Sequence, residues 1–217
     1  HAMLLMLAVC RRLVWQHANV SSGRWRGNDA PPRLFELHGR TLGIIGLGTI
    51  GKKVARLAAG FGMRVHYYDI ARLSEDAEDT LGVRFRLLPE ILSTSDIVTL
   101  HVPLNDATRN MIGAAELQRM RPSAVLINTC RGPVVDEVAL HHALATGRLA
   151  GAGLDVFAEE PPPSDHPLFG LGNVVLTPHM AGPTWESQHA RIRNAFDNVQ
   201  RVARGERPLW VIPELRN

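Results

Sequence analysis

Residues 42–51 read LGIIGLGTIG, and this stretch decides the fold. A short apolar run leads into three glycines with the spacing GxGxxG, which predicts a buried strand, a tight turn and a helix start. In such a turn Gly46 allows the chain to reverse, Gly48 lets the backbone approach a pyrophosphate, and Gly51 lets helix and strand pack closely. The free N–H groups at the helix N-terminus favour phosphate. The stretch therefore predicts a dinucleotide site, although a glycine-rich turn of another α/β protein has the same spacing.

A second apolar run, residues 64–68, ends in Asp69, 18 residues beyond Gly51. A carboxylate at this position can accept hydrogen bonds from the ribose hydroxyls of adenosine. The same carboxylate repels the additional phosphate of NADP, so NAD is the expected cofactor and NADP is the less favoured one. Arg72 follows three residues later and can stack on adenine or partly offset that repulsion.

From residue 41 onward, short apolar runs alternate with longer segments of helical character. This alternation predicts an α/β fold, a Rossmann doubly wound parallel sheet flanked by helices. The expected strands are 42–46, 64–68, 97–101, 124–128, 151–156 and 174–176. The expected helices are 50–61, 88–93, 114–120, 136–146 and 184–204.

The composition is that of an ordinary globular protein. The 217 residues carry a formal net charge of +3, and the basic residues are spread along the chain, which argues against nucleic acid as a partner. Two cysteines suggest neither a disulfide framework nor a metal site, so no metal and a reducing, cytoplasmic setting are expected.

The N-terminal segment is strongly apolar. Residues 1–20 are predicted to form one helix that is apolar almost all round and hence buried in a core or against another subunit. Its apolar run stops at Arg11 and is too short to span a bilayer, so no membrane association is expected. Residues 21–40 are polar and contain Gly and Pro, as a loop or linker does.

Three segments that follow later strands carry candidate chemical groups, because the strand ends of an open α/β sheet form its ligand site. Arg131 directly follows a strand and can clamp a carboxylate bidentately, or it can be a surface arginine in a loop. Asp155 stands near a strand end, where it can accept a hydrogen bond from a nicotinamide carboxamide. Glu160, five residues on, can reach a histidine or belong to a solvated acidic turn. His179 follows the last strand and is either a proton donor or a satisfied structural group.

Taken together, these segments resemble the D-isomer-specific 2-hydroxyacid dehydrogenases over nearly the whole chain. The matching pieces are GIIGLGTIG (43–51), SDIVTLHVPLNDATRNMI (95–112), INTCRGPVVDEVAL (127–140), GAGLDVFAEEP (151–161) and VVLTPHMAG (174–182). The ordered set is much more specific than any single piece.

The resemblance implies an NAD-dependent oxidoreductase that transfers a hydride between nicotinamide and a D-2-hydroxyacid or 2-oxoacid. Arg131 would bind the substrate carboxylate and stabilise charge on the carbonyl oxygen, and His179 would be the acid–base. Glu160 would pair with His179 and favour the imidazolium. The implied cofactor-binding residues are Gly46, Gly48, Thr49, Ile50, Gly51, Asp69, Arg72, His101, Pro103, Thr108, Thr129, Cys130, Asp155, His179 and Gly182.

Members of this family usually begin with a substrate domain, and this chain starts where the linking helix of that architecture normally begins. Residues 1–217 are therefore interpreted as a dinucleotide-binding domain. Within it, residues 1–25 would form a linking and dimerisation helix of a homodimer, and residues 186–217 a C-terminal helix and tail that pack on the substrate domain. A chain lacking that domain would expose apolar surface.

Two alternatives to an active dehydrogenase stay open. One is a non-catalytic NAD-sensing module, as in corepressors that resemble these dehydrogenases. The other is a cofactor-binding fragment that is inactive by itself. Formate oxidation is disfavoured, because formate dehydrogenases that resemble this site carry an amide at the position of Glu160. The particular 2-oxoacid is left open.

Overall fold

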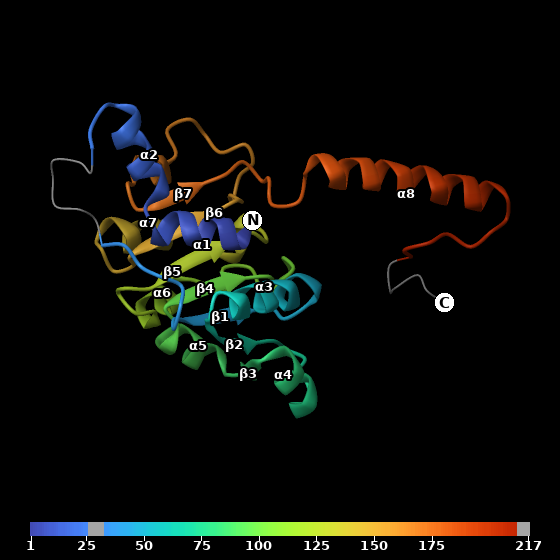
Figure 1. Ribbon diagram of the computed structural model, residues 1–217, viewed down its shortest axis with the longest axis horizontal. Coiled ribbons are helices and arrows are strands. Elements are labelled where there is room, and N and C mark those ends of the chain that lie inside the picture. The colour runs from blue at the N-terminus through green and yellow to red at the C-terminus, as the bar shows by residue number, and fades with distance from the viewer. Residues whose placement is uncertain (26–32, 212–217) are drawn as a thin grey trace. The chain divides into compact units, whose positions relative to one another are not determined.

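The computed structural model describes residues 1–25 and 33–211. The chain divides into two compact units, His1–His179 and Met180–Asn217. The first unit contains the whole sheet and nearly all of the predicted site, and Figure 1 shows its elements. The predicted linker 21–40 and the C-terminal tail each lie partly outside the described residues.

One parallel sheet organises the first unit, with strand order β3-β2-β1-β4-β5-β6-β7. In Figure 1 the strands stack in this order from β3 below to β7 above. The strands are β1 (Thr41–Ile45), β2 (Arg64–Tyr68), β3 (Val83–Phe85), β4 (Ile97–Leu100), β5 (Val125–Asn128), β6 (Gly151–Leu154) and β7 (Val174–Leu176). The order reverses direction between β1 and β4, which is where a doubly wound sheet opens a crevice for its ligand. The predicted fold class is confirmed.

Helices cover both faces of this sheet (Figure 1). Those of the first unit are α1 (Ala2–Cys10), α2 (Leu13–Ser21), α3 (Thr49–Gly60), α4 (Glu75–Leu81), α5 (Leu88–Thr94), α6 (Ala114–Arg119) and α7 (Glu137–Ala145), with short 3-10 turns at Gly132–Val134 and Pro167–Gly170. Side chains of α1 and α3 form one hydrophobic core with one face of the sheet. Side chains of α5, α6 and α7 form a second core on the opposite face. Because successive strand residues alternate between these cores, Ile44 and Ile45 belong to different ones.

The prediction of a single buried helix over residues 1–20 is wrong in two respects. The segment forms two helices, because Arg12 adopts the left-handed conformation with a φ of 52° and breaks the segment before Leu13. Only α1 is buried; in α2 the side chains of Leu13, Val14 and Val20 are more than half exposed. The apolar composition of α2 reflects a surface that this unit leaves uncovered.

Two elements, α4 and β3, were not expected from the sequence. The strand β3 has three residues and alternates Val83 and Phe85 with a charged Arg84, and α4 reads EDAEDTL, so neither has an apolar run. Tertiary contacts support both, since Val83 is fully buried and β3 pairs with β2. Helix α4 is also capped, because the Ser74 side chain accepts a hydrogen bond from the Ala77 N–H.

The second unit contains one helix, α8 (Trp185–Ala203), among its described residues 180–211. Thr184 caps it by accepting a hydrogen bond from the Ser187 N–H. Several large apolar side chains of this unit are exposed, namely Trp185, Ile192, Phe196, Val199, Val202 and Trp210. Among the described residues, no helix has both the length and the apolar character needed to cross a membrane.

Candidate active site

The glycine turn after β1 has the close contacts that its spacing predicts. Gly46 has a φ of 93°, and a Cβ there would lie 2.5 Å from the carbonyl oxygen of His101. A Cβ on Gly51 would lie 2.2 Å from the carbonyl oxygen of Gly46. Residues larger than glycine would push the strand, turn and helix apart at these two positions.

Gly48 differs from these two glycines, because no atom lies within 4 Å of the position that its Cβ would occupy. Gly48 is the N-cap residue of α3 and its helix start has no side-chain cap, so backbone N–H groups at this terminus keep their capacity for an anion. Thr49 and Ile50, in the first turn, are exposed, Ile50 by 63%. Open space before an uncapped helix start fits a pyrophosphate.

Asp69 is hydrogen-bonded to the glycine turn that follows β1. Its carboxylate accepts a hydrogen bond of 2.6 Å from the Leu47 N–H and one of 3.0 Å from the Ala71 N–H. Each carboxylate oxygen can accept two bonds, so capacity for ribose hydroxyls remains. The sequence placed Asp69 at the end of β2, and the structure adds that the turn orients it.

Arg72 has partners other than the adenine and phosphate considered for it. Its Nε donates to Glu78 Oε1 over 3.2 Å, and its guanidinium lies 5.2 Å from the centre of the Phe85 ring. Its role as a cofactor contact remains a prediction.

The loop after β4 carries three further predicted residues. The backbone N–H of His101 donates to the Ile45 carbonyl over 2.7 Å, so His101 borders the glycine turn. Burial lowers the pKa of His101 to about 4, so this imidazole is neutral at neutral pH. The Thr108 hydroxyl donates to the Pro103 carbonyl over 2.6 Å and closes the loop.

The buried side chain of Asn128 shapes the turn after β5. It accepts hydrogen bonds from the backbone N–H and the thiol of Cys130, and its amide donates to the Arg131 carbonyl over 2.9 Å. Thr129, between Asn128 and Cys130 in the sequence, is half-buried. Burial raises the pKa of the Cys130 thiol, which argues against a reactive thiolate. Arg131 is exposed, and its Nη1 donates to the Cys130 carbonyl over 2.5 Å.

The loops after β5 and β6 touch at Gly132. A Cβ on Gly132 would lie 1.9 Å from the carbonyl carbon of Phe157 and 2.0 Å from its oxygen. This contact holds Arg131 beside the loop that carries Glu160.

Asp155 is completely buried at the end of β6. Its carboxylate accepts a hydrogen bond of 2.5 Å from the Thr177 hydroxyl and lies 3.3 Å from His1 Nε2. Its backbone carbonyl accepts a hydrogen bond of 2.7 Å from the His179 N–H. Asp155 therefore joins the loops that follow β6 and β7.

His179 and Glu160 form the pair that the resemblance implied. His179 Nδ1 lies 2.7 Å from Glu160 Oε2, while Glu160 Oε1 accepts a bond of 3.0 Å from the Phe157 N–H. His179 is in the left-handed region, with a φ of 56°, a conformation that its two backbone hydrogen bonds maintain.

The electrostatics of this pair also involve Arg131. Burial works to raise the pKa of Glu160, but hydrogen bonds from His179 and Phe157, together with the charges of His179 and Arg131, hold that pKa below its ordinary value. Glu160 is thus a carboxylate at neutral pH, beside His179 and Arg131.

A pocket of about 440 Å³ opens beside this pair. Glu160, Thr177 and His179 supply its polar groups, and its apolar lining comes from Phe157, Pro161, Pro162, Phe169, Leu176 and Pro178. Such a mixture suits a small molecule with an ionised group and an apolar part.

Gly182 lies in the second unit, where its carbonyl accepts a hydrogen bond from the Ser187 hydroxyl. Over residues 1–25 and 33–211, no group of three His, Cys, Asp or Glu side chains is arranged to hold a metal ion.

Four residues that were not predicted from the sequence also shape the site. His1, Asn128, Gly132 and Thr177 support the predicted residues through the contacts above. The signal for Asn128 and Thr177 was their place at strand ends, next to the candidates that they hold. Nothing in the sequence indicated His1 or the tight approach at Gly132.

A parallel sheet with a glycine turn, an uncapped helix and an acid after the next strand defines a dinucleotide-binding domain of the Rossmann class. Residues 3–181 match the family described as "D-isomer specific 2-hydroxyacid dehydrogenase, NAD binding domain". The chain belongs to this family, and NAD is the cofactor of the matched domain.

Individual relatives agree with this assignment. The glyoxylate reductase of Korarchaeum cryptofilum is 47% identical over 209 residues, which are 95% of this chain and 63% of that protein. The crystal structure of D-lactate dehydrogenase with NAD+ from Lactobacillus jensenii matches with a TM-score of 0.86 and 31% identity. The match covers 97% of this chain and 66% of the dehydrogenase chain. An acyclic imino acid reductase in complex with NADPH and D-Arg matches with a TM-score of 0.84 and 34% identity. The match covers 98% of this chain and 66% of the reductase chain. The chain spans slightly less than two thirds of the length of the curated relatives it matches.

Proposed function

We propose that this chain is the cofactor-binding part of an NAD-dependent oxidoreductase that interconverts a D-2-hydroxyacid and a 2-oxoacid. The observation that carries the proposal is the 2.7 Å hydrogen bond between His179 and Glu160 at the carboxyl edge of the sheet. An acid–base group oriented by a carboxylate, with an arginine beside it, is what reduction of a ketoacid requires.

The cofactor would lie along the same edge. The turn at Gly46–Gly51 with Thr49 and Ile50 would take the pyrophosphate, Asp69 the adenosine ribose, and Asp155 the carboxamide. When bound, NADH supplies a hydride to the carbonyl carbon of the acid. The remaining predicted residues of the first unit would contribute to the walls, namely His101, Pro103, Thr108, Thr129 and Cys130.

The chain's own residues would manage the charge and the proton. Arg131 binds the substrate carboxylate bidentately and stabilises negative charge on the carbonyl oxygen. His179 delivers a proton to that oxygen from its protonated ring. Glu160, already ionised, keeps the ring oriented through its 2.7 Å hydrogen bond to Nδ1. In the oxidative direction the neutral ring accepts the proton.

The substrate class follows from the relatives and the pocket together. Several relatives are glyoxylate reductases, so glyoxylate is the first 2-oxoacid to test. The apolar lining beside His179 also has room for a side chain larger than that of glyoxylate.

Assembly and location are further parts of the proposal. The exposed apolar side chains of α2 favour a homodimer formed through the N-terminal segment that contains α2, and those of α8 favour packing on a substrate domain. Both cysteines are free and buried, which is consistent with a reducing, cytoplasmic setting.

The test is NADH oxidation by the purified protein with glyoxylate, hydroxypyruvate and larger 2-oxoacids. We expect turnover with at least one acid, and a loss of at least about a hundredfold in kcat in His179→Ala, the range that general acid–base groups contribute. His189→Ala, which changes an exposed histidine of α8, is the matched control.

The outcomes separate the remaining alternatives. Equal rates in His179→Ala and the parent would overturn the acid–base assignment. NADH binding without turnover of any 2-oxoacid would favour the NAD-sensing module or an inactive cofactor-binding fragment instead.

A further inference from the structure

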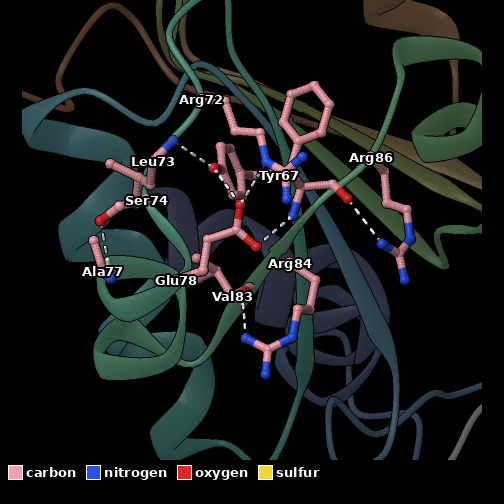
Figure 2. A network of polar contacts seen from close by, with 10 residues as sticks. Tyr67, Arg72, Leu73, Ser74, Ala77, Glu78, Val83, Arg84 and Arg86 are labelled. Atoms are coloured by element: carbon pink, nitrogen blue, oxygen red, sulfur yellow. Dashed lines mark hydrogen bonds and ion pairs between the residues drawn. The ribbon is translucent and has the colours of Figure 1, made fainter.

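Glu78 is a buried carboxylate beneath the loop that follows Asp69. It lies on α4 with only 3% of its surface exposed, and three donors meet it (Figure 2). The Tyr67 hydroxyl donates to Oε1 over 3.0 Å, the Arg72 Nε to the same oxygen over 3.2 Å, and the Phe85 N–H to Oε2 over 3.4 Å.

The charge of Glu78 persists in this environment. Burial by itself would raise its pKa, but the hydrogen bonds from Tyr67, Arg72 and Phe85 and the charge of Arg72 bring the pKa below its ordinary value. A buried carboxylate of this kind needs a cation as its partner, and Arg72 is that cation.

Arg72 is held on a second side as well. Its guanidinium lies 5.2 Å from the centre of the Phe85 ring. Figure 2 shows the Arg72 side chain close to Tyr67. The stack and the ion pair together set the direction of this side chain.

The same network shapes the loop between β2 and α4. The Leu73 N–H donates to the Tyr67 hydroxyl over 2.9 Å, and Ser74 caps α4 immediately afterwards. At the start of the loop, the Ala71 N–H donates to Asp69. Arg72 stands between these two anchors, three residues from the carboxylate that is predicted to meet the adenosine ribose.

We propose that Glu78 is a positioning residue that maintains selectivity for NAD over NADP by holding Arg72 away from the 2′ position of the adenosine. This rests on the cofactor site of the proposed function and extends it. A free arginine on this loop would pair bidentately with a 2′-phosphate and offset its repulsion by Asp69. With the guanidinium bound to Glu78, the repulsion by Asp69 acts unopposed.

The experiment measures dissociation constants for NADH and NADPH by fluorescence titration of the purified chain. Glu78→Gln keeps the shape of the side chain but removes its charge. We expect the ratio of the NADPH to the NADH dissociation constant to fall at least about fivefold, a coupling of ordinary size. The double variant Glu78→Gln/Arg72→Ala should regain the parental ratio, because the released arginine is what attracts the phosphate.

Arg84→Ala is the matched control. Arg84 on β3 makes an exposed ion pair of 2.8 Å with Asp79 on α4, the helix that also carries Glu78. Its removal should leave the ratio unchanged. If Glu78→Gln weakens both cofactors equally, or if the double variant keeps the lower ratio, the proposal is wrong.

A single Arg72→Ala variant tests the proposal even where Glu78→Gln fails to fold. If Arg72 is held by Glu78, the ratio should stay within about twofold of the parental one, since the guanidinium then does not meet the 2′-phosphate. A selective loss of NADPH binding would show that Arg72 already serves the phosphate and would overturn the proposal. Absence of NADH binding by the parental chain would instead overturn the proposed function.

Discussion

The carboxylate of Asp69, at the end of β2, accepts a hydrogen bond of 2.6 Å from the backbone N–H of Leu47, inside the glycine turn after β1. The two parts of the dinucleotide motif are thus bonded to each other before any cofactor enters. This bond orients the carboxylate and, in turn, stabilises a turn that contains a left-handed glycine.

Replacing Asp69 with Asn should weaken NADH binding. An amide has one acceptor oxygen, so it cannot accept from Leu47, Ala71 and a ribose hydroxyl as the carboxylate can. A lost hydrogen bond to a charged group costs about 1.5–3 kcal/mol, so the dissociation constant should rise at least about tenfold. Fluorescence titration measures this, with exposed Asp76→Asn as control. Unchanged affinity would contradict the role of Asp69.

Gly48→Ala should separate cofactor binding from folding. The new methyl group meets no atom within 4 Å, so the free energy of unfolding should change by less than about 1 kcal/mol. NADH binding should weaken at least about tenfold, because the methyl group blocks approach to the turn. Urea unfolding and NADH titration test both parts. Gly51→Ala, whose methyl group would lie 2.2 Å from the Gly46 carbonyl oxygen, should instead destabilise the fold. Full NADH affinity in Gly48→Ala would rule out this placement of the pyrophosphate.

Gly132→Ala should destabilise the first unit. Its methyl group would overlap the Phe157 backbone, and overpacking of this kind costs about 1–3 kcal/mol. The free energy of unfolding in urea measures the effect. Gly172→Ala is the matched control, since the space around Gly172 is open. Equal stability of the two variants would mean that the loops after β5 and β6 separate easily.

The His179–Glu160 pair should give the stability of the chain a pH dependence at acidic pH. Because the pKa of Glu160 is lowered in the folded state, its contribution is complete above the unfolded value of 4.5 and disappears as pH falls through the lower folded value. The difference in melting temperature between the parent and Glu160→Gln should therefore shrink as the pH falls below about 4.5. Glu159→Gln controls for loss of a neighbouring exposed carboxylate. A difference that does not vary with pH would contradict the ionic character of the pair.

Local patterns predicted some elements far better than others. The strands that line the site were recognisable because buried parallel strands are continuous apolar runs between turn residues. Helix α4 and strand β3 were not predicted, because a polar helix and a strand of three residues have no continuous apolar run. Strand β3 depends instead on its pairing with β2. Helices α1 and α2 were predicted as one helix over residues 1–20, since the apolar composition continues across the break at Arg12.

The amino-acid sequence by itself determined the order of the elements and the turn that begins the cofactor site. Those features depend on short-range sterics: a glycine at position 46 permits a backbone conformation that few other residues adopt, and alternating apolar runs decide which faces are buried. The tertiary structure decided which side chains meet. Glu160 reaches His179, Gly132 touches Phe157, and Glu78 pairs with Arg72. The Glu160–His179 and Gly132–Phe157 contacts join segments that follow different strands, so they exist only once the order of the sheet has brought those segments together. The Glu78–Arg72 contact lies within the segment between β2 and β3, and it depends on α4 packing beside β3.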